Sequence, residues 1–202
     1  MFYEPRKNDH GLRYNPFKAL VAPRPIGWVT TLSAKGEVNL SPYSFFNAVS
    51  DRPDIVVFSS AGYKDAITFA EETGEFVCNL ATWDLREAMN ATSAPLARGR
   101  SELEFAGLTP APCRIVKPPR VAESPVALEC KWLKTVALEP LEGPAKYHMV
   151  IGEVVGTHID DHFIIDGIVD TAGMRPIARA GYHEYFVATP DTKFAMDRPP
   201  GG

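Results

Sequence analysis

Residues 126–138, with the sequence VALECKWLKTVAL, constrain the fold more than any other segment of this chain. Apolar residues stand at most of the even-numbered positions, and charged residues such as Glu129 and Lys131 stand between them. Successive side chains of a β-strand point to opposite faces of a sheet, so this period of two is typical of a half-buried strand. An amphipathic helix would repeat its apolar positions every three or four residues. We therefore predict a long strand here.

Six further segments have the length and composition of strands. They lie at residues 25–33, 37–46, 54–60, 75–80, 147–159 and 162–170. Gly36 suits the left-handed position of a short loop between the first two, which predicts a hairpin. Asp166-Gly167 is a tight-turn signal within the last segment.

Helices are few and short. Apolar residues at positions 63, 66, 67 and 70 predict one helix over about residues 63–72, with Asp65 in its first turn and Gly74 just past its end. Two brief helices are expected after Asp84 and Ser101, because each has a glutamate three residues later, the spacing of a capping box. Residues 91–125 are proline-rich and irregular, which is typical of a connection that crosses a fold or covers a site.

Strands outnumber helices by about two to one in this interpretation, and no βαβ rhythm or internal repeat is present. We predict a mainly β protein, a closed antiparallel barrel or a sandwich with a few inserted helices, because closure removes exposed strand edges. The absence of a G-x-G-x-x-G or P-loop motif disfavours a Rossmann or P-loop nucleotide site. We expect residues 1–202 to form a single domain, with extensions at about 1–20 and 186–202.

Composition excludes several classes of function. With 45% hydrophobic and 23% charged residues, the chain has the composition of a soluble globular protein. A formal net charge of -4 without a basic stripe argues against a nucleic-acid partner. No apolar run reaches membrane-spanning length and the N-terminal residues lack the pattern of a signal peptide, so we expect no membrane association and a cytoplasmic protein.

No metal site is predicted. The three cysteines Cys78, Cys113 and Cys130 fall in no metal-ligand spacing, and we expect buried, reduced thiols. The THIDDHF cluster at residues 157–163 holds two histidines and two aspartates, which we interpret as a solvated loop.

The segment FSSAGYKD at residues 58–65 suits a phosphate group. A strand ends there in Ser59 and Ser60, and a helix begins near Lys64. Unpaired N–H groups at a helix N-terminus, two hydroxyls and an ammonium group together attract an anion. The alternative is that Ser60 only caps the helix. Likewise, Thr30, Thr31 and Ser44 are either polar strand residues on a solvated face or ligand contacts.

An ordered series of motifs resembles the flavin reductase-like family of FMN-binding split β-barrels. It consists of RPIGWVTT at 24–31, NLSPYSFFN at 39–47, Ser59-Ser60, Lys64-Asp65, TGEFVCNL at 73–80, AGL at 106–108, PRVAESP at 119–125, LEC at 128–130 and HMVIGEV at 148–154. The similarity covers residues 23–179. Two positions depart from the family pattern: Ala66 stands where a threonine is usual, and RAGYHEY at 179–185 replaces the usual Arg-x-Gly-Gly.

The resemblance implies a Greek-key antiparallel split barrel, and a homodimer with two non-covalent FMN molecules near the subunit interface. It also assigns roles to ten residues. The flavin ring would be contacted by the strand around Thr30 and Thr31, with Ser44 and Asn47 at its edge, and the phosphate by Ser59, Ser60 and Lys64. Arg24 would assist the phosphate or the dimer contact, Asn79 would add a polar contact, and His148 would bind nicotinamide.

The implied activity is that of an NAD(P)H:flavin oxidoreductase, in which NADH or NADPH reduces FMN by hydride transfer. The electrons would pass to a monooxygenase or another electron-transfer partner, and residues 91–125 would form a lid over the flavin. Two alternatives stay open at this point. One is a non-catalytic, flavoredoxin-like electron carrier without a productive nicotinamide pocket. The other is a barrel that has lost the flavin.

Overall fold

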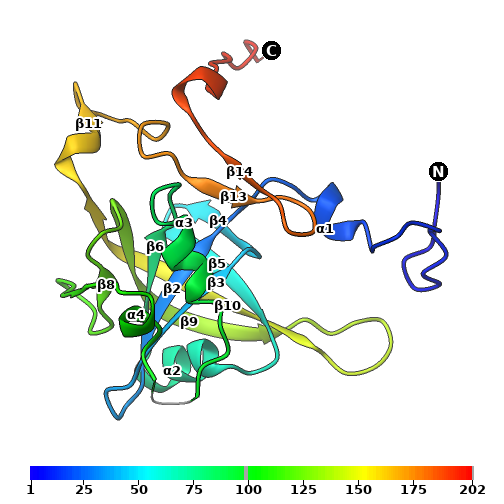
Figure 1. The fold of residues 1–202 in the computed structure, drawn as a ribbon, viewed down its shortest axis with the longest axis horizontal. Helices are drawn as coiled ribbons and strands as arrows, with labels where there is room; N and C mark the ends of the chain where they lie inside the picture. Colours follow the sequence, from blue (N-terminus) through cyan, green and yellow to red (C-terminus); the bar gives the residue numbers. More distant parts are fainter. Residues whose placement is uncertain (98–99, 202) are drawn as a thin grey trace.

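The structure is a computed structural model that describes residues 1–97 and 100–201. Its centre is a seven-stranded antiparallel sheet that curls around a core (Figure 1). The spatial order is β3 (Val38–Tyr43), β2 (Gly27–Leu32), β6 (Glu75–Leu80), β9 (Val126–Ala137), β10 (Tyr147–Ile159), β5 (Asp54–Ala61) and β4 (Phe46–Asp51). Within the described residues β3 and β4 are not paired, so the barrel is split. In this sheet β9 and β10 lie between β6 and β5, two strands that precede them in the chain. This strand order confirms the prediction of a mainly β, Greek-key split barrel.

The longest pair, β9 and β10, confirms the two clearest strand predictions. Their register runs from Val126 opposite Ile159 to Ala137 opposite His148, with irregularities at Ile151/Gly152 and Val154/Gly156. Their connection, residues 138–146, projects from the barrel on the same side as the N-terminus (Figure 1).

The predicted turns form as expected. Gly36 closes the β2–β3 hairpin with φ +86° and donates its N–H to the carbonyl oxygen of Ser33 at 3.0 Å. Asp166 and Gly167 have φ values of +50° and +76° between β11 (Ile164–Ile165) and β12 (Ile168–Val169). The segment 162–170 is therefore a small hairpin and not one strand. In the described residues no helix is long and apolar enough to cross a membrane.

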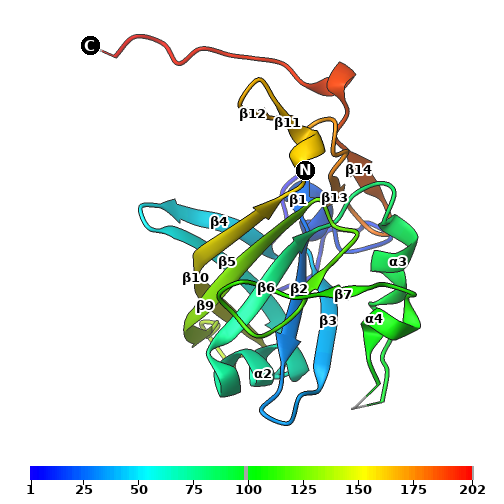
Figure 2. The same ribbon diagram turned by 90° about the vertical axis from the view of Figure 1, so that its left-hand side faces the viewer.

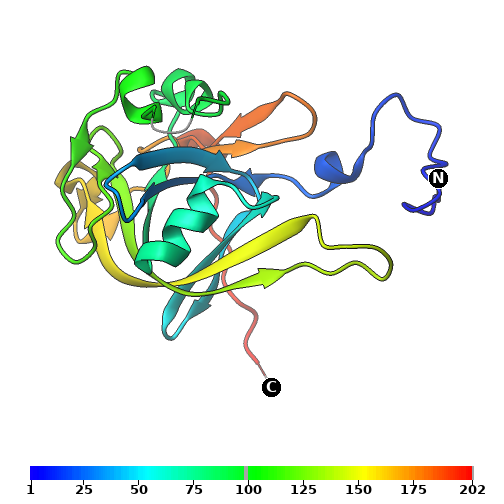
Figure 3. The same ribbon diagram turned by 90° about the horizontal axis from the view of Figure 1, so that it is seen from below.

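Helix α2 (Asp65–Thr73) lies across one end of the barrel (Figure 3). Its buried residues Ile67 and Ala70 join the core formed by the inner faces of the strands, with Val29, Phe58 and Val150. Gly74 ends the helix with φ +71°, and its N–H donates to the carbonyl oxygen of Ala70 at 2.9 Å. The predicted helix and its C-terminal glycine are confirmed.

Residues 81–125 cover the outer face of β2 and β3, which leaves these strands buried on both sides. This connection contains α3 (Arg86–Ala91), α4 (Glu102–Phe105), β7 (Pro110–Ala111) and β8 (Arg120–Val121). Met89 and Leu103 pack against Trp28 and Leu40, and the Trp28 indole donates to Thr92 Oγ1 at 2.9 Å. The described part of 91–125 is thus a cover for the sheet, because its apolar side chains are needed there, and its role as a lid over the flavin stays a prediction.

Neither short helix has the predicted capping box. Asp84 lies 3.5 Å from Arg175, and α3 begins after Leu85 without a side-chain cap. Ser101 precedes α4 but caps no backbone group. Glu102 is the residue that fixes α4, since its buried carboxylate accepts the N–H of Leu40 at 3.1 Å.

Two buried carboxylates on adjacent strands hold the loop at residues 114–117. Glu129 of β9 accepts the N–H groups of Arg114, Ile115 and Val116 at 2.6–2.9 Å. Glu75 of β6 accepts the N–H of Lys117 at 2.8 Å. Burial alone would raise the pKa of the Glu129 carboxyl, but these N–H groups and His158 outweigh it and lower the pKa to about 2.

The terminal segments lie outside the barrel. Strand β1 (Arg24–Pro25) pairs with β13 (Ile177–Arg179), which pairs with β14 (Tyr185–Val187). The N-terminal residues lead through α1 (Phe17–Leu20), and an ion pair of 2.9 Å joins Arg6 to Glu142 in the β9–β10 connection. Two 3-10 turns, η1 (Asp161–Phe163) and η2 (Pro190–Thr192), follow later, and the C-terminal residues extend away from the barrel (Figure 2).

Candidate functional site

Two consecutive serines at the end of β5, Ser59 and Ser60, point to opposite faces of the sheet. Ser60 lies opposite His148 of β10, on the face that carries the core residue Phe58. Ser59 lies on the outer face, and its N–H donates to the carbonyl oxygen of Phe45 at 2.8 Å. The predicted phosphate-binding pair is therefore divided between the two sides of the barrel wall.

A cleft of about 850 Å³ opens on the outer side, between α1, Phe45 and the β9–β10 connection. Phe45 and Tyr147 form an edge-to-face pair in it, with ring centroids 5.9 Å apart. Lys18, Ser59 and Lys146 supply its polar groups. Apolar walls with a few placed polar groups are typical of a small-molecule or cofactor site.

A hollow of about 330 Å³ adjoins this cleft at Lys18 and is lined by Ser44, Arg24 and Arg179. Asn47 is exposed and pairs with Val57, so strand alternation puts its side chain on the same face of the sheet as Ser59. The structure thus brings predicted contacts from three separate motifs to one outer face.

The inner side of the same wall holds two buried polar atoms without a partner. Ser60 Oγ and His148 Nδ1 make no hydrogen bond of normal geometry within the described residues, although the Tyr43 hydroxyl lies near Ser60. The ring of Tyr63 lies edge-on to His148 with centroids 4.6 Å apart, and burial raises the pKa of nearby Tyr43 to about 12. Buried polar groups are nearly always paired, so this corner has spare capacity to bind a ligand.

The start of α2 is open to solvent next to this corner. Lys64 is the N-cap residue, is exposed, and makes no side-chain cap. Ser60 belongs to β5, so the alternative in which it caps the helix is wrong. The Lys64 ammonium group and the N-terminal end of the helix dipole give this position positive charge, which the carboxylate of Asp65 in the first turn partly offsets.

Two of the predicted contacts, Thr30 and Asn79, are engaged inside the protomer. The Asn79 amide donates to Thr30 Oγ1 and to the carbonyl oxygen of Trp28, both at 2.9 Å, and accepts the N–H of Val121 at 2.8 Å. Thr31 is fully buried on the inner face of β2, and its Oγ1 has no hydrogen-bond partner among the described residues. The Thr30 and Asn79 side chains join β2, β6 and β8.

Arg24 organises the wall of the smaller hollow. Its guanidinium donates to the carbonyl oxygens of Lys18, Val21 and Ala180, the last two at 2.5 and 2.9 Å. Burial and the nearby Arg179 lower its pKa. With these donors occupied, Arg24 fixes α1 beside the cleft.

Sequence reasoning missed Lys18, Phe45, Lys146 and Tyr147 as lining residues. Phe45 carried a signal, because it directly follows Ser44 in the NLSPYSFFN motif. Lys18 comes from the N-terminal extension, Lys146 from the β9–β10 connection and Tyr147 from the start of β10, and their meeting depends on how these segments pack.

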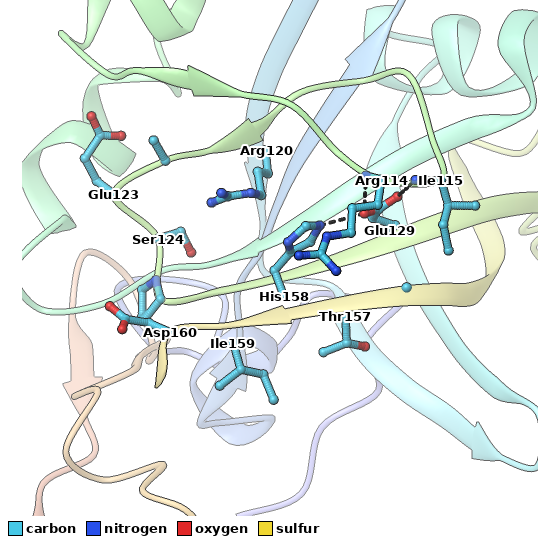
Figure 4. Close-up of a pocket in the computed structure, with 13 residues that line it drawn as sticks. Arg114, Ile115, Arg120, Glu123, Ser124, Glu129, Thr157, His158, Ile159 and Asp160 are labelled. Carbon is cyan, nitrogen blue, oxygen red and sulfur yellow. Dashed lines mark hydrogen bonds and ion pairs between the residues drawn. The ribbon is translucent and has the colours of Figure 1, made fainter. Parts of the chain in front are cut away.

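A second, polar pocket of about 500 Å³ lies at the other end of β10 (Figure 4). His158 lines it from β10, half-buried, with Nε2 2.6 Å from Glu129 Oε1. The prediction of a solvated loop was therefore wrong for His158, because β10 continues through it, and right for the exposed Asp160 and His162. Cys113 is half-buried rather than buried, whereas Cys78 and Cys130 are buried as predicted.

Ligand atoms of Cys113, Glu129 and His158 lie within 4.8 Å of one another, a grouping that the cysteine spacing did not reveal. Burial, followed by the charge of Glu129, raises the pKa of the Cys113 thiol to about 11, so it is protonated at neutral pH. Glu129 is already saturated by N–H donors. The cluster is therefore poorly suited to a cation.

Comparison with known proteins gives a consistent result over most of the chain. Residues 20–169 match the model described as flavin reductase like domain. An uncharacterized protein of Halalkalibacterium halodurans is 36% identical over 184 residues, covering 89% of this chain and 87% of that protein.

Two solved structures are also similar. Nitrilotriacetate monooxygenase component B from Bacillus cereus superposes with a TM-score of 0.88 at 30% identity, covering 97% of this chain and 98% of that one. The 2-nitrobenzoate 2-nitroreductase NbaA of Pseudomonas fluorescens gives a TM-score of 0.85 at 25% identity, covering 100% and 99% of the two chains.

Proposed function

Because this chain belongs to the flavin reductase-like family, we propose that it binds FMN at the cleft beside Phe45 and catalyses the reduction of FMN by NADH or NADPH. When bound, FMN supplies two-electron redox chemistry through its isoalloxazine ring. The protein then has three tasks: to hold the cofactor, to orient the nicotinamide donor, and to limit access to the ring.

The residues present fit this cofactor. The 850 Å³ cleft combines the aromatic walls of Phe45 and Tyr147 with the polar groups of Lys18, Ser59 and Lys146. The buried, unpartnered Ser60 Oγ is a donor that a ligand would satisfy. The aromatic cleft, with Ser59 and two lysines among its lining residues, is the observation that carries the proposal.

We assign the polar contacts by position. Ser44, Asn47 and Ser59 would contact the flavin from the outer face, while Ser60 and Lys64, on the inner side and at the start of α2, would hold the phosphate at the end of β5. Arg24 would support this surface by holding α1, and Thr30, Thr31 and Asn79 would act indirectly through the packing of β2 and β6, because their side chains are buried.

His148 is the proposed contact for the nicotinamide. Its Nδ1 is buried without a partner, and the ring is oriented by Tyr63. A neutral imidazole in this position can donate to or accept from a carboxamide. Its role would be to position the donor and not to transfer a proton.

We further propose that the protein acts as a homodimer with the cofactors near the interface. Large apolar side chains are exposed on β4 and on the β9–β10 connection, including Val49 at 58% and Leu141 at 92%. Burying such residues is typical of an obligate interface. By analogy with the monooxygenase component B that it resembles, the enzyme would deliver electrons to a separate oxygenase component or another acceptor.

The direct test is an anaerobic titration of the FMN-loaded protein with NADH, and in parallel with NADPH, following the visible band of the oxidised flavin. The expected result is bleaching much faster than that of free FMN with at least one donor. A bound flavin that neither donor bleaches would favour the electron-carrier alternative. A protein that binds no FMN would overturn both.

A further inference from the structure

The polar pocket of about 500 Å³ beside His158 lies far from the proposed flavin cleft. His158 and His148 are ten residues apart on β10, so at about 3.3 Å per residue roughly 30 Å separates them along the strand. No part of a ligand bound at His148 of the same protomer would fill this pocket. The proposed flavin site therefore does not explain the presence of this polar pocket.

Two arginines in the pocket have no acidic partner. Arg114 and Arg120 point into it from the loop before β8 and from β8 itself (Figure 4). Neither guanidinium forms an ion pair or hydrogen bond with a described residue, and Arg120 Nε is buried without an acceptor. Leaving a buried charged donor unpaired is costly, so the geometry favours an anion that is not part of the protomer.

The carboxylates that line the pocket are all engaged elsewhere. Glu129 receives three backbone N–H groups and lies against His158. Glu123 accepts the N–H of Thr109 with both oxygens, at 3.0 and 3.2 Å. Asp160 accepts from the backbone of His162 and contacts its ring at 2.9 Å. Although all three are negatively charged, none of them forms an ion pair with either guanidinium among the described residues.

We propose that this pocket binds a phosphate group, with Arg114 and Arg120 as its ligands. Guanidinium groups match the geometry of phosphate oxygens with two parallel hydrogen bonds. The pocket exceeds what a single phosphate ion requires, and Ile115, Pro125 and Ile159 give it an apolar wall. Its occupant is therefore a small phosphate ester. This inference is independent of the proposed function, because it uses none of the cleft residues.

The test is isothermal titration calorimetry on FMN-saturated protein in a phosphate-free chloride buffer. The probes are inorganic phosphate, adenosine 5′-monophosphate and adenosine. We expect both phosphorylated probes to bind and adenosine not to bind. Arg120→Met and Arg114→Gln should each weaken binding at least tenfold, while Arg198→Met, which removes an arginine from the exposed C-terminal segment, should leave it unchanged.

Several results would overturn the proposal. One is that neither inorganic phosphate nor adenosine 5′-monophosphate gives a heat of binding at millimolar concentration. The others are that the two pocket variants bind as tightly as the wild type, or that phosphate binds only when FMN is absent. Because Arg114 is exposed, Arg114→Gln should fold normally even if Arg120→Met does not. The remaining alternative is that the two arginines contact a second copy of the chain, and sedimentation of both variants tests it. This alternative would be supported if the variants lose the dimer and the wild type binds no phosphate.

Discussion

His148 of β10 and Ser60 of β5 face each other across the sheet, and each has a buried polar atom that no described residue satisfies. An unpaired buried donor or acceptor costs about 1–3 kcal/mol of stability. Two unpaired polar atoms at one position of the sheet indicate a site where polar groups are available to bind a ligand. Mutations there should therefore affect binding and stability in opposite directions.

Replacement of Ser60 by alanine should weaken FMN binding about tenfold, because it removes a proposed phosphate donor. Without FMN, the same change should leave the free energy of unfolding unchanged or raise it by about 1 kcal/mol, since an unsatisfied hydroxyl is lost. Flavin fluorescence titration and urea unfolding of the apoprotein measure the two effects. A less stable apoprotein with normal FMN affinity would assign Ser60 a structural role.

His148→Ala should raise the KM for the nicotinamide donor about tenfold, with little change in FMN affinity. The reason is that the imidazole is proposed to contact the donor and not the flavin. Steady-state kinetics with NADH and NADPH provide the measurement, and His162→Ala is the control because His162 is exposed in η1. Unchanged KM and turnover in His148→Ala would exclude the role.

Lys64→Ala should weaken FMN binding about tenfold and reduce its dependence on salt, because a charge near the phosphate is lost. Riboflavin, which lacks the phosphate, should bind the variant and the wild type equally. The matched control is Lys35→Ala, at the exposed β2–β3 turn. Equal losses for FMN and riboflavin would contradict a phosphate contact.

The fold was largely predictable because its strands carry local signals. The alternation in residues 126–138 became β9, and the turn residues Gly36 and Gly74 took the left-handed conformations that their positions required. The capping boxes failed because spacing alone does not reveal competing partners. Asp84 meets Arg175 from a segment about ninety residues away, a contact that only the tertiary fold creates.

Glu129→Gln should destabilise the protein in a pH-dependent manner. The folded-state pKa of Glu129 is lowered to about 2, so its carboxylate contributes stability above the unfolded pKa near 4.5, and this is lost as the pH falls towards 2. At pH 7 the expected loss is on the order of 3 kcal/mol. Urea unfolding from pH 7 to pH 3 should show the variant and wild type converging, while the exposed Glu104→Gln behaves as wild type throughout.

Gly152→Ala should destabilise the barrel by about 3 kcal/mol through overpacking. A Cβ at Gly152 would lie 2.3 Å from Phe76 Cζ in the core and 3.1 Å from the carbonyl oxygen of Lys131. Phe76→Leu should partly rescue the variant, because it removes the first of these contacts. Denaturant midpoints of the two single variants and the double variant test this; strictly additive losses would contradict the clash.

The site was less predictable than the fold. Motifs identified Ser44, Ser59 and Lys64, but the division of Ser59 and Ser60 between two faces follows from the pairing of β5 with β10. Thr30 and Asn79 lie in matched motifs, yet they bond to each other across β2 and β6. Lys18 comes from a segment without a sequence signal, and it meets Tyr147, at the start of the predicted strand, only through packing.

The two carboxylates that hold residues 114–117 also set an order of folding. Glu75 and Glu129 become neighbours only when β6 pairs with β9, which brings Glu75 opposite Lys131 across more than fifty residues. Closing so long a loop is slow compared with forming the β2–β3 hairpin. We therefore expect residues 114–117 of the covering segment to gain their anchor only after β6 and β9 have paired.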